Sequence, residues 1–440
     1  MTTKKIVFFL LLVGFQLSAQ NKKWTLEECV DYAIKNNISI KQSELDLKIS
    51  DVDKLEAIGG FLPTLNGNAN YSMNTGASIN PVTNQFQNQT FKSMSASANS
   101  GLMLFNGLAN WKTLQRAKLS KIANSYRLDK MKDDIALSIA NSYLQILFNK
   151  EQLKVQKNQN AITKENIKRT QELIQAGSLP AGDIYELQAT DATQEQQIVT
   201  TENAILISKI GLCQILFLED YMNFDISDEV IDLPLTNIAN ESQEAILEKA
   251  KESVKDVKIA MANFDVAKKD VALSRSSYLP TITGFLGYNT RWAESIPFNF
   301  IDQLTLFDGT AVGLQLSVPI LNGFATRGRV QRAKINQERS EFQLKQAELD
   351  LERNVYQAYN DVINAKKSFE AAQKTLEARK QSYNFSKERY EVGLMNSFDY
   401  SQATIAYENA QSEVLRTKYD YIFRTKILEF YFGIPLVKKQ

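Results

Sequence analysis

The sequence predicts a mainly α-helical protein that also contributes four β-strands to a membrane β-barrel, and that is built as an internal two-fold repeat. Three observations predict this fold class: one stretch of sequence that occurs twice in similar form, four runs that alternate apolar and polar residues, and two helical patterns of about 70 residues each. Because the repeat covers nearly the whole chain, it constrains the architecture before any single element is considered.

The repeated stretch spans residues 104–118 and returns at residues 320–334, an interval of 216 residues. Both copies mark the same event, the end of an alternating run at Asn-Gly and the start of a long helical pattern. The same interval relates Gly177 to Gly393 and Asp183 to Asp399. We therefore predict a first structural repeat over residues 21–240 and a second over residues 241–440.

Composition excludes several functions. The chain has 51 basic and 50 acidic residues, which gives nucleic-acid binding no electrostatic support. It has no histidine, so the usual general base and the commonest metal ligand are absent. There is also no phosphate-binding loop or metal-ligand cluster. We predict no enzyme activity, no catalytic residue, no metal and no cofactor.

The first twenty residues resemble a secretory signal peptide. Lys4 and Lys5 precede an apolar run that is too short to span a bilayer, and small residues follow before a plausible cleavage after Ala19 or Gln20. A buried apolar N-terminus is the alternative. Export would permit disulfides, yet Cys29 and Cys213 both fall in helical patterns, where small apolar packing is the default role.

The helical patterns at the start of each repeat come next. Residues 24–57 read as one helix that opens on a capping box between Thr25 and Glu28. Residues 241–276 repeat that helix in the second half, after a mixed linker at 219–240. Beyond the signal peptide no apolar run reaches the ~20 residues that a membrane helix needs, so we expect any membrane span to be made of strands.

Four runs then alternate with a period of two, as strands do. They cover about 64–74, 93–104, 282–292 and 312–320, and a polar loop is predicted at 75–89. One face is apolar and the other carries Asn, Ser, Gly and Gln, which is typical of a membrane barrel with a wet lumen, although a soluble sheet would alternate in the same way. The aromatic residues that we predict at the membrane interface are Tyr71, Tyr288 and Trp292.

Each Asn-Gly is followed by a helical pattern, at 108–176 and at 324–392. At 1.5 Å per residue each helix would be about 105 Å long, far more than a globular core needs. The second one carries a coiled-coil stripe and, beside it, a second stripe through Tyr356, Tyr359 and Ile363. Two stripes predict a neighbour on each side, as in a ring of helices rather than a two-helix rod. The first stripe consists of Leu351, Val355, Ala358, Val362, Ala365, Phe369, Ala372 and Leu376.

Both long helices are predicted to turn back in tight hairpins. Gly177 and Gly393 can end them in a left-handed cap, and Asp183 and Asp399, six residues later, can cap the returning helices. The returning helices run to about residues 218 and 432.

Four strands cannot close a membrane barrel, because the smallest known have about eight, and an open edge in lipid leaves backbone groups unpaired. Two copies would give eight strands, whose interior side chains fill, whereas three give twelve and room for water. The polar inner faces therefore favour a homotrimer.

These features together resemble the TolC-like outer-membrane efflux protein family. The residues that carry the resemblance are the start of the mature chain at 24–33 with Asn36-Asn37, the paired Leu-Pro-Thr and Asn-Gly markers, and the two hairpins with residues 389–394. The resemblance implies a homotrimer in the outer membrane, with a twelve-stranded β-barrel that is continued by a periplasmic α-barrel. It also implies an exit duct for small molecules or proteins. Such a duct would dock a periplasmic adaptor and serve an inner-membrane transporter of the RND, ABC or MFS type.

The resemblance also implies site residues at the periplasmic ends of the hairpins. Adaptor docking maps to Val392, Gly393 and Leu394, and less well to Ala176, Gly177 and Ser178. The family narrows its aperture with two aspartates three residues apart. Here Asp399 matches the first and Gln402 replaces the second, while the other repeat offers Asp183 and Glu186. Tyr390 matches a family residue that helps to hold the periplasmic tip shut. In the family, that residue forms its bond near the position that corresponds to Asp183. Capping or surface solvation would explain the same tip residues without any channel role.

A periplasmic coiled-coil adaptor or scaffold is the main alternative function. It would explain the helical hairpins but not the four lipid-compatible strands, and a passive porin would not need paired helices of this length. The sequence does not name the exported substrate or the partner pump.

Overall fold

The computed structural model describes residues 23–79, 83–228 and 241–434, so the predicted signal peptide lies outside the described residues. The chain divides into two units, which we describe separately. Unit 1 comprises Met1–Glu44, Arg127–Val257 and Ala347–Gln440, and unit 2 comprises Leu45–Tyr126 and Lys258–Gln346. The division into repeats at residue 240 remains a prediction.

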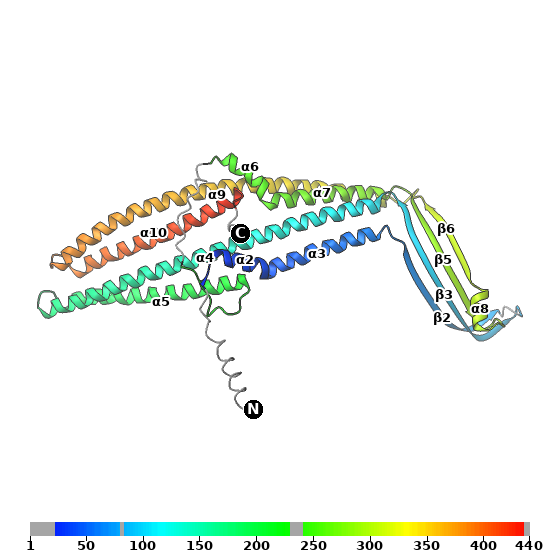
Figure 1. Cartoon of the computed structure of the whole chain (residues 1–440), viewed down its shortest axis with the longest axis horizontal. Helices are drawn as coiled ribbons and strands as arrows, with labels where there is room; N and C mark the ends of the chain where they lie inside the picture. Colours follow the sequence, from blue (N-terminus) through cyan, green and yellow to red (C-terminus); the bar gives the residue numbers. More distant parts are fainter. Residues whose placement is uncertain (1–22, 80–82, 229–240, 435–440) are drawn as a thin grey trace, which may run out of the picture. The chain divides into compact units, whose positions relative to one another are not determined.

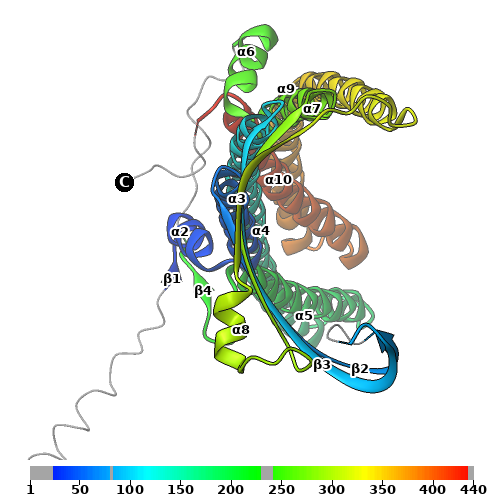
Figure 2. The ribbon, with the colours of Figure 1, turned by 90° about the vertical axis from the view of Figure 1, so that its right-hand side faces the viewer.

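Unit 2 contains a four-stranded antiparallel sheet in the order β2-β3-β5-β6. The strands are β2 (Thr64–Ile79), β3 (Phe86–Asn106), β5 (Thr281–Ala293) and β6 (Gly309–Ser317). They lie side by side (Figure 1) and bend together into one strongly curved sheet (Figure 2). All four predicted strands are therefore present, and two come from each half of the chain.

The register places the predicted apolar residues on one face. Met94 pairs with Tyr71 on one side and with Trp292 on the other, so these aromatic residues share one level of the sheet. Ile282, near the start of β5 and ten residues before Trp292, pairs with Leu316. Ten residues of extended strand separate the two levels by about 33 Å. Between these levels the face is apolar and largely exposed, while the opposite face carries the Asn and Ser residues, as the alternation predicted.

The boundaries of the strands differ from the prediction. Most of the expected loop at 75–89 is strand, because β2 and β3 continue as a hairpin. The pairing shifts between Met103 and Phe105, so Leu104 sits in a bulge that breaks the alternation. β6 ends at Ser317, short of the predicted residue 320. A short helix, α8 (Phe300–Leu306), was not predicted. Its fully buried Gln303 accepts a hydrogen bond from the backbone of Ala293, which fixes α8 to the end of β5.

The duplicated Asn-Gly marks the change from strand to helix in both halves. Gly107 and Gly323 have φ angles of 66° and 57°, and the next residue in each copy is also left-handed. At Gly107 a β-carbon would lie 2.7 Å from the carbonyl oxygen of Ser276, so both the backbone angle and the space require glycine there. The chain can therefore pass from strand to helix within two residues.

Two long helical hairpins extend through unit 1 (Figure 1). They are formed by α4 (Ala109–Gln175) with α5 (Asp183–Leu216), and by α9 (Ala325–Glu391) with α10 (Ser397–Tyr431). α4 and α9 have 67 residues each, close to the predicted ranges, and would measure about 100 Å. The start of each long helix belongs to unit 2.

Two apolar clusters hold these helices together away from the hairpin turns. The first joins α4, α5 and α10 through fully buried residues such as Ile146, Leu212 and Ile422. The second joins α9 and α10 through Val355, Val362 and Leu428. All members of the predicted coiled-coil stripe from Leu351 to Ala372 are buried, and Leu376 is half-buried, so that stripe is confirmed.

The two shorter helical patterns each split at one residue. The predicted helix 24–57 is α2 (Leu26–Asn36) and α3 (Ile38–Gly59), and the predicted helix 241–276 is α6 (Gln243–Ser253) and α7 (Lys255–Ser276). Asn37 makes the first break, because its side chain accepts from the backbone of Ser39 and donates to the carbonyl of Ile215. The capping box of Thr25 and Glu28 is present as predicted.

The predicted linker also contains structure. β4 (Asp225–Ile226) pairs in parallel with β1 (Lys23–Trp24), and neither strand was predicted. Asp225 lies 2.8 Å from both Lys150 of α4 and Lys209 of α5, which ties the small sheet to the first hairpin. Residues 229–240 of the predicted linker lie outside the described residues.

By length and composition alone, α5 is apolar enough to cross a membrane, which the sequence analysis did not expect. Its side chains form ion pairs with α4, at Glu195 with Lys164 and at Glu202 with Lys157, and its apolar side packs in the first cluster. We therefore assign α5 to the helical hairpin. Cys29 and Cys213 are both buried in that same cluster, and burial raises the pKa of the Cys213 thiol to about 11.

Candidate functional site

The turns of the two helical hairpins use the same backbone. Gly177 and Gly393 have φ angles of 73° and 75°. In the first turn the amide of Ser178 donates to the carbonyl of Leu173 at 2.9 Å, and in the second the amide of Leu394 donates to the carbonyl of Arg389 at 2.8 Å. These are Schellman caps, so the predicted left-handed glycine ends are confirmed.

The returning helices begin differently from each other, and neither aspartate caps as predicted. Asp183 is the first residue of α5, whose N-cap is Gly182 and has no side-chain hydrogen bond. In the second hairpin Asn396 is the N-cap, and its side chain accepts from the amide of Asp399 at 2.8 Å and donates to its carboxylate at 3.0 Å. Asp399 sits in the first turn, where a negative charge favours the helix dipole. Asn396, which directly precedes α10, is therefore the N-cap in place of Asp399.

Tyr390 lies inside the second hairpin and not in the turn. It is 5% exposed, its ring stacks on Tyr400 at 4.6 Å, and its hydroxyl is 2.8 Å from the hydroxyl of Thr170 on α4. Burial raises the pKa of Tyr390, and the nearby negative charge of Asp183 adds to the rise. The partner of Tyr390 within the chain is therefore Thr170, and Asp183 acts on it only through charge.

Further polar contacts join the first hairpin to the second. Asn166 donates to the hydroxyl of Tyr400 at 2.9 Å, and Arg169 pairs with Glu391 at 3.0 Å. Further from the turns, three more hydrogen bonds join polar side chains of the two hairpins. They are Thr190 with Ser401 at 2.9 Å, Gln194 with Glu408 at 2.6 Å, and Gln152 with Ser412 at 2.7 Å.

The residues predicted to dock an adaptor lie at the surface of the two turns. Val392 is 68% exposed and Leu394 is 70% exposed. Phe398, which the sequence analysis did not single out, is 56% exposed beside them. The first turn offers only small exposed groups at its predicted positions, Ala176, Gly177 and Ser178. The second turn is therefore the more apolar of the two, and the docking role of both remains a prediction.

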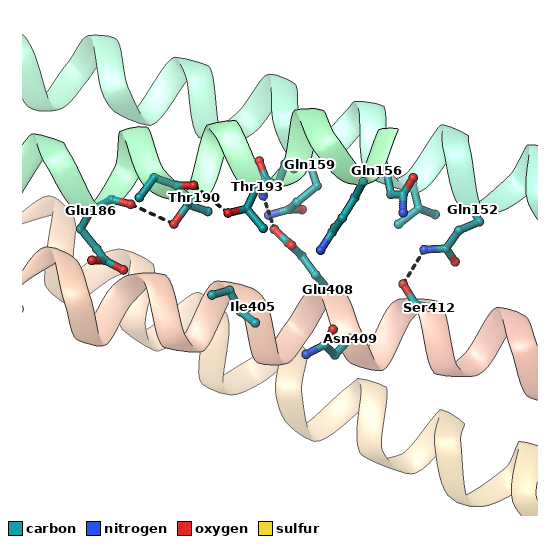
Figure 3. A pocket seen from close by; sticks show the side chains of 14 residues that line it. Gln152, Gln156, Gln159, Glu186, Thr190, Thr193, Ile405, Glu408, Asn409 and Ser412 are labelled. Atoms are coloured by element: carbon teal, nitrogen blue, oxygen red, sulfur yellow. Dashed lines mark hydrogen bonds between the residues drawn. The ribbon is translucent and has the colours of Figure 1, made fainter. Parts of the chain in front are cut away.

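Besides Tyr390, four residues are predicted for the aperture, and no hydrogen bond or ion pair joins these four to one another within the described chain. Asp399 and Gln402 are exposed, and Asp183 is half-buried. Glu186 lies along α5 and lines a cavity between α4, α5 and α10 (Figure 3). An aperture would have to be completed by other copies of the chain, so this role also stays a prediction.

Tyr390 was predicted as a site residue, but its stacking with other tyrosines in the second hairpin was not predicted. Tyr383 and Tyr390 are seven residues apart on α9, and Tyr400 and Tyr407 are seven apart on α10. The rings of Tyr383 and Tyr407 stack at 5.1 Å. The equal spacing on two antiparallel helices was the signal that could have shown this cluster.

In the described residues no group of three or more His, Cys, Asp and Glu side chains is arranged to hold a metal ion. The tips therefore offer exposed apolar side chains, carboxylates and a seam of hydrogen bonds between two hairpins. These features suit binding and movement between helices.

The family model described as "Outer membrane efflux protein" matches residues 30–216 and 246–432. The chain belongs to this family. The two matched segments carry the two hairpins, one in each half of the chain. The efflux protein accordingly belongs in the outer membrane, where it forms an exit duct for efflux or for type I secretion.

Three known proteins show the range of similarity. Outer membrane protein TolC of Vibrio cholerae is 22% identical over 316 residues, which cover 71% of each chain. Alkaline protease secretion protein AprF of Pseudomonas aeruginosa is 25% identical over 170 residues, or 39% of the efflux protein and 34% of AprF. The crystal structure of the CmeC outer membrane channel of Campylobacter jejuni has a TM-score of 0.77 at 18% identity, covering 94% of the efflux protein and 86% of CmeC.

Proposed function

We propose that the efflux protein works as a homotrimer that receives its cargo from a periplasmic adaptor and an inner-membrane transporter. The observation that carries the trimer is the open sheet. In the described structure β2 pairs only with β3, and β6 only with β5, so both outer edges keep unpaired backbone groups. Such edges cost several kcal/mol per group in lipid, and further copies of the same sheet would pair them.

Exposed stripes on the helices support the same assembly. On α3, Leu45, Ile49 and Val52 follow the spacing of one helix face and are 54–58% exposed. On α9, Ile335 and Phe342 are seven residues apart and are 56% and 61% exposed. The α9 stripe continues at the same interval through Leu349, Tyr356 and Ile363. A stripe with a period of seven is the surface that a coiled-coil neighbour covers.

Charges beside the two stripes are complementary. Arg327, Arg332 and Lys334 lie near the start of α9, and Asp53 and Glu56 lie near the end of α3. No ion pair reaches any of these five among the residues that the structure describes. We propose that α3 of one copy packs along α9 of the next, which is a head-to-tail contact that closes into a ring.

The assembly is tested by the double variant Ile335→Glu with Phe342→Glu. We expect it to run as a monomer in mild detergent, since two charges would be buried without partners in the proposed contact. The control is Gln343→Glu, at an exposed polar position next to Phe342, which should remain trimeric. Sedimentation equilibrium distinguishes the two. A trimer that survives the double variant would show that α9 is not the contact.

Adaptor docking is proposed at the second turn. Val392, Leu394 and Phe398 form an exposed apolar surface at the end of a rigid hairpin, whereas the first turn presents small residues. Exposed apolar groups of this kind are typical anchors of a protein interface. We expect Leu394→Asp to abolish crosslinking to the adaptor, while Ser178→Asp weakens it less.

The cargo defines two candidate roles. The match to the family model described as "Outer membrane efflux protein" covers most of the chain and favours efflux, while the AprF match favours protein secretion over a shorter segment. Gene deletion separates them: drug and dye sensitivity would support efflux, and loss of a secreted protein would support secretion. If neither tolerance nor secretion changed, the duct proposal would be wrong. The alternative function, a periplasmic coiled-coil adaptor or scaffold, does not explain the exposed apolar face of the sheet.

A further inference from the structure

A cavity lined mainly by polar side chains lies between the two hairpins, beside residues 186–197 of α5 and 405–412 of α10 (Figure 3). It measures about 220 Å³ and is bordered by α4, α5 and α10. Glu408 of α10 points into it, and its carboxylate accepts a hydrogen bond of 2.6 Å from Gln194 of α5. Among the residues that line the cavity, Glu186 is the only other ionisable one, and no cation lines it. Glu408 therefore has no charged partner in the cavity.

Three glutamines of α4 line this cavity. Oε1 of Gln152 and Oε1 of Gln156 are buried and have no hydrogen-bond partner among the described residues, and Gln159, which is 5% exposed, lies beside the carboxylate of Glu408. Buried polar atoms without partners are costly, and a polar cavity of this size has room for water. Water molecules in this cavity could therefore bind the unpartnered polar atoms between the two hairpins.

The neighbouring levels are polar as well. On the side of the turns, Thr190 and Ser401 share a hydrogen bond of 2.9 Å, and on the other side Gln152 donates to Ser412 at 2.7 Å. A net stability of about 1 kcal/mol is typical of each such bond, because water can replace either partner. At the level of the cavity, separation of α10 from α4 and α5 therefore mainly exchanges hydrogen bonds, whereas nearer the turns it would also expose the cluster that includes Leu187 and Tyr400.

We propose that Glu408 is a proton-controlled latch between the two hairpins. In its neutral form the carboxyl group allows α10 to pack against α4 and α5, and its ionisation draws water into the cavity and releases α10. The consequence for the duct, that the hairpin ends separate more readily when Glu408 is charged, rests on the proposed function.

The direction of the pH dependence follows from burial. Burial raises the pKa of Glu408 from 4.5 to about 7 in the packed arrangement. In separated hairpins the carboxyl group would be in water and would regain its ordinary pKa. The packed arrangement then binds the proton more tightly, so its advantage is complete below the ordinary pKa and is lost as the pH rises to about 7. Each unit of difference in pKa is worth tenfold, so a pKa that falls from about 7 to 4.5 shifts the equilibrium by roughly 300-fold at most.

Other charged groups near the cavity have partners of their own or lie outside it. On α5, Asp191 accepts a hydrogen bond from Asn160 at 2.7 Å, and Glu195 pairs with Lys164 at the surface. On α4, Lys157 pairs with Glu202. No residue of α9 lines the cavity. Glu186 is therefore the other carboxyl group in the cavity whose protonation could control the packing of α10.

The test measures the distance between the hairpins in the full trimer. Spin labels at exposed Val199 of α5 and exposed Arg416 of α10 report the separation, after the buried Cys29 and Cys213 are replaced by alanine. We expect the ratio of packed to separated populations to rise at least tenfold from pH 8 to pH 5. Glu408→Gln should remain packed at both pH values, because its amide is always neutral.

Two further variants make the outcome decisive. Glu195→Gln, which removes a surface acid beside Gln194, should keep the full pH response. The proposal is overturned if Glu408→Gln still responds to pH, or if Glu186→Gln abolishes the response in its place. Conductance of the reconstituted protein is recorded in parallel. Absence of conductance with an intact distance change would refute the duct and leave the latch, whereas conductance with a distance that ignores pH would refute the latch alone.

Discussion

The four long helices are held together differently in two regions of unit 1. Away from the turns, α4, α5, α9 and α10 meet in apolar clusters with fully buried residues such as Ile146, Val355 and Ile422. Toward the turns, the two hairpins meet through hydrogen bonds such as those of Asn166 with Tyr400 and Gln194 with Glu408, together with a smaller buried cluster that includes Leu187 and Tyr400. The same helices thus change from larger apolar clusters to a mixed contact with many hydrogen bonds along their length.

This difference indicates where the protein can move. Separating an apolar contact exposes surface at about 25 cal/mol per Å², whereas a polar contact loses little net free energy when water replaces it. Movement of the hairpins is therefore expected at the turns, with the apolar region as the fixed end. The following predictions test this contrast, from the largest effect to the smallest.

Truncation in the apolar region should cost most. Ile422 is fully buried in the first cluster, and we expect Ile422→Ala to lower the free energy of unfolding by about 3 kcal/mol, since it removes buried methylenes and leaves a cavity. Ile405→Ala is the matched change near the turns, at a side chain that is 37% exposed, and should cost less than about 1 kcal/mol. Denaturant unfolding followed by circular dichroism measures both. Equal losses would contradict the contrast.

The turns should depend on backbone conformation more than on packing. Gly393 has a φ angle of 75° with open space around it, so the cost of Gly393→Ala comes from the left-handed conformation alone, about 1–2 kcal/mol. Gly182→Ala is the control, since Gly182 has a φ angle of −70° and the same open space. It should be neutral or slightly stabilising in the same unfolding assay. A neutral Gly393→Ala would contradict the assigned cap.

Removal of one hydroxyl should have a smaller effect on stability. In Tyr400→Phe the ring stack with Tyr390 remains, but the hydrogen bond from Asn166 is lost, which should cost about 1 kcal/mol. Tyr185→Phe, at a position that is 69% exposed, should change nothing measurable. In the spin-label experiment Tyr400→Phe should also raise the separated population, and an unchanged population would place the fixed end nearer the turns.

The smallest effect is expected for a surface ion pair that spans α9 and α10. Arg424 lies 2.9 Å from Asp361, with side chains 40% and 32% exposed. A double-mutant cycle with alanine at both positions should give a coupling of about 0.5 kcal/mol, because water screens such pairs. A coupling above about 2 kcal/mol would mean that charge, and not apolar packing, fixes this region.

Several features could be predicted from the sequence because they depend on local rules. The alternation around Tyr71 and Tyr288 gave the strands and their apolar face, and the period of seven through Val355 gave the buried stripe. Gly177 and Gly393 gave the ends of the long helices, since only glycine adopts a left-handed cap without strain. Features set by competition between neighbours were missed. Asn37 interrupts a helix because it bonds a distant carbonyl, and Asn396 takes the cap that was predicted for Asp399.

The candidate site shows the same limit. Its position at the two turns followed from the duplicated Gly and Asp and from the family resemblance, and exposure of Val392 and Leu394 agrees with a docking surface. The partner of Tyr390 and the cavity of Glu408 did not follow, because each depends on which residues of α4 and α5 face α10. Those facing residues are separated by about 200 positions in the sequence.

The sequence by itself determined the repeat, the helical hairpins, the two-faced strands and the family, since each is carried by periodicity or by short motifs. Only the tertiary structure decided which polar groups meet between the hairpins, that Glu408 is half-buried in a cavity without a charged partner, and that the outer strands of the described sheet keep open edges. The physical reason is that hydrogen bonding and desolvation depend on distances in space, which the spacing of residues along one chain does not set.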